Sequence, residues 1–418
     1  MNWLTVAFAA ALAAETATRL YLAGRQMAAV RAHRDHVPAA FAGHITLADH
    51  RKAADYTVAR VRFGRVSAVA EPLIKLGLTL GGGLAAIDAG VARLSTAEPW
   101  HGCLVVLVAF LLLQLLGLPF ALWRTFRIEA RFGFNRISPR LFVTDLAKGL
   151  AVGLALGAPL VWVTLSLMER AGRWWWVWAW LVWLVATLGL TWAAPRFIAP
   201  LFNRFKAITD EALQRRVETL LRRCGFTAAG GVFVMDGSRR SAHGNAYFTG
   251  IGRNKRIVFF DTLLSRIEPP ELEAVLAHEL GHFRLHHVRL RLITSMVASL
   301  VGLALLGFLS GEPGFYAAFG VPPSAAMALL VFVVAVPVFT YFATPIEAWW
   351  SRRHELAADK FAAEVADAGS LISALVKLYR DNASTLTPDR LHSAFYDSHP
   401  SAIERIAHLE RLAPRPAA

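Results

Sequence analysis

Seven long apolar segments constrain the fold of this chain more than any other feature of its sequence. A helix needs about 20 mostly apolar residues to cross the hydrocarbon core of a bilayer, which is about 30 Å thick. The segments that meet this requirement are Leu4–Leu22, Val69–Val91, Cys103–Trp123, Phe142–Met168, Trp174–Ala194, Leu292–Leu309 and Ala325–Ala343. The first has no basic stretch before it and no obvious cleavage site, so we expect a retained helix rather than a signal peptide. The sequence therefore predicts a mainly α-helical, multi-pass membrane protein.

The overall composition supports this interpretation and excludes other classes of protein. Hydrophobic residues make up 56% of the 418 residues, charged residues only 18%, and the mean hydropathy is +0.43. A soluble globular chain has about 25% charged and about 45–50% apolar residues. Such an apolar chain is not intrinsically disordered. Its two cysteines also exclude a disulfide-stapled secreted domain.

The distribution of basic residues predicts how the chain is oriented in the membrane. Lysine and arginine number 44 against 30 acidic residues, a net charge of +14. They concentrate after the first, third, fifth and seventh apolar segments, whereas residues 310–324 contain none. By the positive-inside rule, the N-terminus is extracytoplasmic and the C-terminus cytoplasmic, in a bacterial inner membrane or an endoplasmic reticulum membrane. We expect membrane lipid but no nucleic acid as a partner, since no nucleic-acid recognition motif accompanies the charge.

The apolar segments divide the chain into four parts. Residues 1–195 form a membrane bundle with the first five spans and basic cytoplasmic loops, and 291–345 contain the sixth and seventh spans. Residues 196–290 are a cytoplasmic catalytic segment, and 346–418 are a C-terminal cytoplasmic segment.

The segment 196–290 is the stretch that most resembles a soluble domain. An amphipathic pattern predicts a helix over 210–224, and short apolar runs predict strands over 231–235, 246–249 and 256–260. We expect a turn through Gly250, Gly252 and Asn254 between the last two strands. Proline at 269 and 270, followed by an acidic residue, predicts the start of a further helix. The cytoplasmic part therefore combines helices with a small β-sheet.

The helix that starts at 269 contains the sequence His278-Glu279-Leu280-Gly281-His282. Histidines four residues apart leave the same face of a helix, so both imidazoles can bind one zinc ion. Glu279 points beside such a metal and is placed to take a proton from the attacking water, as the general base of a metalloprotease does. This pattern also occurs by chance in unrelated proteins, so it needs a third ligand elsewhere in the chain.

A second helix, expected over 346–365, offers that third ligand. A catalytic zinc takes three protein ligands, and two histidines with one glutamate are a known set. Glu355 can complete it, and Asp359, one turn later, can accept the free N–H of a ligand histidine. Without the histidine pair, Glu355 would be interpreted as a solvated acid between Arg353 and Lys360. Three neighbouring histidines are expected to take no part: His286, His287 and His354.

Five blocks of sequence then resemble a known family, the type I CAAX prenyl proteases, which are integral-membrane zinc endopeptidases of the gluzincin type. The blocks are Glu129–Asn135, Ile198–Asn203, Asp236–Gly250 continuing through Asn254–Leu264, the two metal-site motifs, and Ser398–Pro400 with Glu404 and Arg405. They extend from about residue 126 to 406. The block around Asn245 is far more specific than the metal motif alone. Gly244 stands where the family often has serine.

The resemblance implies a fold and a metal site. It implies one zinc ion bound by His278, His282 and Glu355, with Glu279 as the base. It also implies that seven helices enclose a large water-filled chamber with the zinc site at its cytoplasmic end.

The resemblance further implies how substrate is held. Asn245, with Ala246 and Tyr247 on the strand after it, would bind the substrate backbone by strand addition. His399 and Arg405 would approach the scissile carbonyl and stabilise the oxyanion. Each also has an ordinary structural interpretation: Asn245 as a turn residue, His399 as a residue before a helix, and Arg405 as a surface charge.

The function predicted from the sequence is therefore that of a membrane zinc metalloendopeptidase. Its substrate is a polypeptide, with or without a C-terminal prenyl group. The family name implies cleavage of a C-terminal tripeptide from a prenylated protein, and removal of misfolded, non-prenylated polypeptides is the alternative. A non-enzymatic membrane chaperone with a vestigial site and a transporter are two further alternatives, and the complete metal motif argues against the chaperone.

Overall fold

Long helices dominate the structure, a computed structural model that describes residues 2–94, 97–226, 231–250 and 256–413. Within these residues six spans are long and apolar enough to cross a membrane, and a bent pair of helices makes a seventh. The long helices are α1 (Trp3–Ala32), α2 (Leu47–Leu78), α3 (Gly83–Ala92), α4 (Trp100–Trp123), α5 (Pro139–Arg170), α6 (Trp175–Ala193), α11 (His287–Leu309) and α13 (Ala325–Thr340). They coincide with the seven predicted segments, and the prediction of a mainly helical multi-pass protein is confirmed.

The second predicted span differs from its expectation because it is not one continuous helix. α2 ends at Leu78, α3 begins at Gly83, and their axes are bent by 49°. A Cβ atom at Gly81 or Gly83 would lie 2.8 or 2.7 Å from the carbonyl oxygen of Gly77. Gly82 has a φ of +76°, which disfavours any residue with a side chain. The glycine run thus permits a sharp turn that an apolar pattern alone does not indicate.

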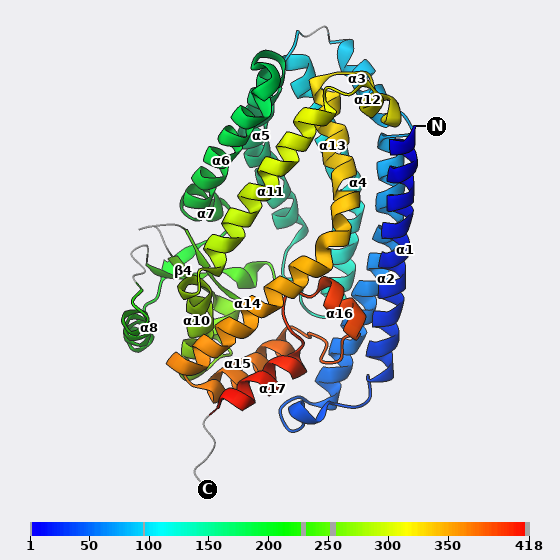
Figure 1. Cartoon of the computed structure of the whole chain (residues 1–418). Coiled ribbons are helices and arrows are strands. Elements are labelled where there is room, and N and C mark those ends of the chain that lie inside the picture. The colour runs from blue at the N-terminus through cyan, green and yellow to red at the C-terminus, as the bar shows by residue number, and fades with distance from the viewer. Residues whose placement is uncertain (1, 95–96, 227–230, 251–255, 414–418) are drawn as a thin grey trace.

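The long helices diverge toward the part of the molecule that contains the small sheet. Figure 1 shows α5, α6 and α11 on one side and α1, α2, α4 and α13 on the other, meeting near α3 and α12 (Pro313–Phe319). At the opposite end lie α10 (Pro269–Arg284), α14 (Thr344–Val365), α15 (Ala368–Asp381), α16 (Arg390–Tyr396) and α17 (Ala402–Leu412). The two predicted helices beginning near 269 and 346 are therefore present as α10 and α14.

A four-stranded sheet lies beside α10. Its strands are β1 (Phe205–Ala207), β2 (Val232–Met235), β3 (Ala246–Thr249) and β4 (Arg256–Phe260), in the order β1-β2-β4-β3. The last three coincide with predicted strands, whereas β1 was not predicted. β2 and β4 are parallel, and β3 is antiparallel to β4. Because β3 is at the end of the sheet, one of its edges is available for a further strand. Of the expected turn residues, Gly252 and Asn254 lie outside the described residues.

A separate apolar core holds this end of the molecule together. The predicted amphipathic helix is α8 (Glu211–Arg223), whose N-cap is Asp210. Its buried face packs with the sheet, α10 and α15, through Leu220, Phe259 and Leu276 among others. Three short helices complete the structure: α7 (Ala199–Phe202), α9 (Asp261–Leu264) and α12.

The start of α10 is fixed by a capping box. The backbone N–H of Glu268 donates to the Glu271 carboxylate at 2.8 Å. That carboxylate also accepts hydrogen bonds from Ser373 and Lys377 of α15, at 2.6 and 2.7 Å. These contacts fix both the first turn of α10 and its position against α15.

The helices α10 and α14 approach each other closely at a glycine. A Cβ atom built on Gly281 would lie 3.1 Å from the Cα atom of Ala358 and 3.2 Å from its carbonyl oxygen. Both atoms belong to the backbone of α14, so they cannot move aside as the end of a flexible side chain can. Gly281 thus allows the two helices to pack at backbone contact.

We therefore predict that Gly281→Ala destabilises the protein although alanine favours helix by about 1 kcal/mol over glycine. Forcing a methyl group against the α14 backbone costs about 1–3 kcal/mol. Thermal unfolding in detergent should show a lower Tm. Gly149→Ala on α5 is the matched control, because nothing lies within 4 Å of a Cβ there. A Tm for Gly281→Ala equal to or above that of Gly149→Ala would contradict the packing argument.

Candidate active site

Two histidines of α10 point their ring nitrogens at one another. His278 and His282 are one helical turn apart, and their Nε2 atoms lie 3.3 Å apart. The side chain of His278 is buried, and that of His282 is partly buried. The i,i+4 spacing that the sequence shows therefore yields a convergent pair of nitrogen ligands.

Glu355 of α14 lies opposite this pair. Its carboxylate oxygens are 3.4 Å from His278 Nε2 and 3.3 Å from His282 Nε2. Atoms bound tetrahedrally to one metal at about 2.0–2.2 Å are themselves separated by roughly 3.3–3.6 Å. The separation of the two Nε2 atoms is in this range, and so are the two carboxylate contacts, which use Oε2 toward His278 and Oε1 toward His282. One ligand atom from each of the three residues lies within 4.8 Å of the other two, and the Glu355 side chain is buried. The two segments far apart in sequence thus form a site whose geometry and donor set fit a tetrahedral metal.

The charge around His278 also fits a cation. Burial alone lowers the pKa of this imidazole, but Asp359 and Glu355 outweigh the effect and raise it to about 9. Two carboxylates therefore make the surroundings favourable to positive charge, whether it is carried by a proton or a metal.

Asp359 occupies the position that the sequence suggested, on the other side of the His278 ring. One of its oxygens lies 2.7 Å from His278 Nδ1, and the residue is completely buried. The hydrogen bond from Nδ1–H leaves Nε2 free to act as a ligand and fixes the plane of the ring.

Arg405 of α17 binds the same aspartate. Its Nε donates to Asp359 at 2.7 Å and its Nη2 at 2.5 Å, in the bidentate geometry that arginine and carboxylate favour. Arg405 is 6% exposed, and its Nη1 is 4.0 Å from Glu355. The structure places it among buried groups, with Nη2 3.3 Å from His278 Nδ1, so it is not the surface charge of the alternative interpretation.

Glu279 and His399 lie next to the three ligands. Glu279 follows His278 on α10 and is half-buried, and this burial raises the pKa of its carboxyl group although His278 and His282 oppose the rise. His399 precedes Pro400 in the segment between α16 and α17, and its Nδ1 is 2.7 Å from Glu355 Oε2. The side chain of His399 is 60% exposed, so it contacts the site and the open space beside it at once.

The segment Asn245–Tyr247 forms the start of the edge strand β3. The carbonyl of Asn245 accepts from Phe260 N–H of β4 at 3.0 Å, which fixes the strand's inner edge. The Asn245 side chain is turned back to accept from Ala246 N–H at 2.8 Å. In the described part of the chain, β3 pairs with β4 alone, so the backbone groups of its outer edge have no strand partner.

His287 is a neighbour of the site that sequence reasoning missed. Its Nδ1 lies 3.1 Å from Nδ1 of His282, and its ring stacks on His354 with centroids 4.0 Å apart. His287 thus contacts a ligand histidine, and the expectation that it takes no part in metal binding or catalysis stays a prediction. His286 has a φ of 60° and turns the chain so that α11 begins with His287 folded back on α10. No sequence pattern indicates this turn.

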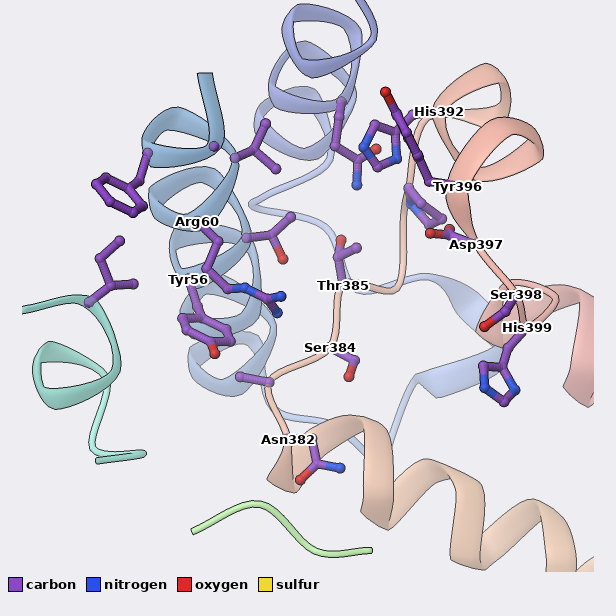
Figure 2. A pocket seen from close by; sticks show the side chains of 18 of the residues that line it. Tyr56, Arg60, Asn382, Ser384, Thr385, His392, Tyr396, Asp397, Ser398 and His399 are labelled. Carbon is purple, nitrogen blue, oxygen red and sulfur yellow. The ribbon is translucent and has the colours of Figure 1, made fainter. Parts of the chain in front are cut away.

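Two large cavities meet at this site. One of 750 Å³ is lined by α2, the π-helical segment after α4 and the chain from Asn382 to Ala402. The other, of 680 Å³, is lined by α11 and α14 and includes Glu355. Both are lined by Tyr396, Ser398 and His399, so His399 is at their boundary. Figure 2 shows His399 at one side of the first cavity, with Tyr56 and Arg60 of α2 on the other.

Comparisons with known proteins agree with this geometry. Residues 26–204 match the family described as the CAAX prenyl protease N-terminal domain with five membrane helices, and residues 207–413 match peptidase family M48. The chain belongs to peptidase family M48. Its M48 part contains both metal-site motifs, and the matched N-terminal part contains the second to fifth spans.

Members of the family from several eukaryotes resemble this chain over most of its length. The CAAX prenyl protease 1 of Saccharomyces cerevisiae is 32% identical over 370 residues, 84% of this chain and 74% of the relative. The human CAAX prenyl protease 1 homolog is 32% identical over 347 residues, 73% of each chain. The crystal structure of S. mikatae Ste24p is 27% identical, covers 98% of this chain and 99% of its own, and superposes with a TM-score of 0.91. The resemblance inferred from sequence is confirmed, and this M48 protein is a multi-pass membrane metallopeptidase.

We predict that Asp359→Asn lowers the metal affinity of this M48 protein by about 10- to 100-fold, because His278 loses its charged hydrogen-bond acceptor. Metal release to a competing chelator measures the change. Asp367→Asn at the N-cap of α15, where Asp367 binds Ser370, is the control and should leave metal affinity unchanged. Equal metal affinity in Asp359→Asn and the unaltered protein would contradict a role for Asp359 in metal binding.

Proposed function

We propose that the metal is zinc, held by His278, His282 and Glu355. The observation that carries this assignment is the convergence of two Nε2 atoms, 3.3 Å apart, on the Glu355 carboxylate, whose two oxygens lie 3.4 Å from His278 and 3.3 Å from His282. Two imidazoles and one carboxylate are a donor set typical of catalytic zinc, which keeps a fourth position open. The bound zinc would polarise the scissile carbonyl and lower the pKa of the attacking water.

The side chains around these ligands transfer the proton, stabilise the oxyanion and position His278. Glu279 accepts the proton of the attacking water and passes it to the leaving nitrogen. His399, exposed at the boundary of the two cavities, donates a hydrogen bond to the developing oxyanion. Asp359 and Arg405 act through His278 as positioning residues, since both are buried behind it.

The outer edge of β3 supplies the means to hold an extended substrate. A peptide that added to this edge at Ala246 and Tyr247 would gain backbone hydrogen bonds without constraint on its side chains. The strand follows Asn245 directly and contacts α10, so the added peptide would pass beside the metal ligands. This arrangement supports endopeptidase action on polypeptides of varied sequence.

The substrate that we propose is a protein with a prenylated C-terminal cysteine, from which the chain removes the last three residues. The names of its relatives support this choice, since they are CAAX prenyl proteases. Removal of damaged, non-prenylated polypeptides is the second candidate, and the sequence-tolerant strand edge favours it. The complete ligand set and the family argue against a non-enzymatic chaperone.

Purified protein loaded with zinc should cleave a farnesylated Cys-aliphatic-aliphatic-X peptide, and Glu279→Ala should lower kcat by at least about 10²-fold. Zinc content should stay at one per chain in the variant, because Glu279 is not a ligand. Cleavage is followed by mass spectrometry of the released tripeptide, beside the same peptide without its farnesyl group. Unchanged turnover in Glu279→Ala would refute the mechanism, and faster cleavage of the bare peptide would favour the second candidate.

We also propose that α10, α14 and the C-terminus face the cytoplasm. The support is the concentration of basic residues in the segments connected to this end of the bundle. A protease-cleavable tag at the C-terminus should be cut in inside-out vesicles and protected in right-side-out vesicles, and a tag at the N-terminus should show the reverse. The opposite pattern would reverse the orientation.

A further inference from the structure

The 750 Å³ cavity beside His399 has an arginine-lined wall that the proposed chemistry does not use. Arg60 of α2 and Arg124, which begins the π-helical segment Arg124–Glu129, both line it. They also line a neighbouring cavity of 640 Å³. The two arginines come from different parts of the chain, and both side chains are exposed to this space.

The described residues neutralise the charge of this wall only in part, through Glu129. Among the described residues, no carboxylate oxygen lies within 4.0 Å of the Arg60 guanidinium. The guanidinium lies over the ring of Tyr56, 5.3 Å from the ring centroid. In the part of the chain that the structure describes, the one carboxylate within 4.0 Å of Arg124 is that of Glu129, at 3.8 Å. Tyr56 donates its hydroxyl to Glu129 at 2.8 Å and so competes for that carboxylate. Both guanidiniums therefore keep donors free for another acceptor.

The rest of the cavity adds neutral polar groups and little negative charge. Of its described lining residues, Asp397 alone carries a carboxylate, and burial raises the pKa of that group. Figure 2 shows Arg60 pointing from α2 toward the chain segment with Ser384 and Thr385, with His399 beyond them. The second cavity at His399 has the opposite balance, since Arg291 is accompanied there by Glu347 and Glu355. An anion next to the site is thus favoured in the first cavity and disfavoured in the second.

We propose that Arg60 and Arg124 bind the C-terminal carboxylate of the substrate and so select for peptide bonds close to a chain end. This inference rests on the proposed function, because removal of the last three residues of a substrate places its C-terminal carboxylate close to the scissile bond, beside this cavity. Three residues beyond the scissile bond extend at most about 10 Å, a length that suits a cavity adjoining the metal site. Arginine binds carboxylates through paired, charge-assisted hydrogen bonds. The backbone within a polypeptide has no carboxylate, whereas a chain end has one.

The test compares two farnesylated Cys-aliphatic-aliphatic-X peptides that differ at one group, a free C-terminal carboxylate or a carboxamide. The zinc-loaded full chain should cleave the carboxylate form with a kcat/KM about 10- to 100-fold higher, the range expected for a hydrogen bond to a charged group. Arg60→Gln and Arg124→Gln should each reduce this preference, and the double variant should abolish it. The rate on the carboxamide should remain unchanged in all three, because that peptide never used the arginines.

Arg62→Gln is the matched control, since Arg62 is on the same helix but lines neither cavity that Arg60 lines. It should keep the full preference for the carboxylate. Equal rates on both peptides in the unaltered chain would overturn the inference, as would arginine variants that slow both peptides alike. If Arg291→Gln lost the preference for the carboxylate peptide and the Arg60 and Arg124 variants kept it, the inference would also be overturned. The carboxylate would then bind in the second cavity. Failure of the unaltered chain to cleave either peptide would refute the proposed function itself, which separates the two conclusions.

Discussion

The close approach of α10 and α14 is the constraint on which the rest of this structure depends. Neither helix alone carries a complete metal site, because the histidines are on one and the glutamate is on the other. Gly281 lies between the two histidines and meets the backbone of Ala358, one residue before Asp359. The same contact therefore sets the distance of Glu355 to both rings and that of Asp359 to His278. A packing requirement and a ligand requirement are met by one glycine.

The buried charges at this contact stabilise one another as a group. An isolated charge in a protein interior is strongly destabilising unless it is paired and hydrogen-bonded. Asp359 is satisfied by Arg405 and His278, and Glu355 is surrounded by His278, His282 and His399. Arg405 comes from α17, so this helix is connected to the metal site through Asp359, His278 and Glu355. This explains why a residue near the end of the chain belongs to the functional core of the molecule.

Local patterns predicted much of this arrangement, and long-range contacts set the limits of prediction. Hydropathy located the spans, and strand and cap signals located β2, β3, β4 and the start of α10, because each depends on adjacent residues. The spacing of His278 and His282 and of Glu355 and Asp359 predicted which faces meet. The bend between α2 and α3 is made possible by the local glycine run, but hydropathy alone does not indicate it. The reversal at His286 and the burial of Arg405 depend on tertiary packing, which no local pattern encodes. The cavities were anticipated only through the family resemblance.

The charged residues within the spans show how the membrane part and the site are connected. Glu15 is 2% exposed on α1, with Arg19 Nη2 at 2.6 Å and Lys75 Nζ at 3.6 Å. Lys75 lines a 390 Å³ cavity that also shares Ser67 and Phe120 with the larger cavity beside His399. Charged groups at this depth are stable only when paired or in contact with water. A series of adjoining cavities, bordered by such groups, therefore extends from among the membrane helices to the metal ligands, and a polar peptide backbone could reach the site without crossing lipid.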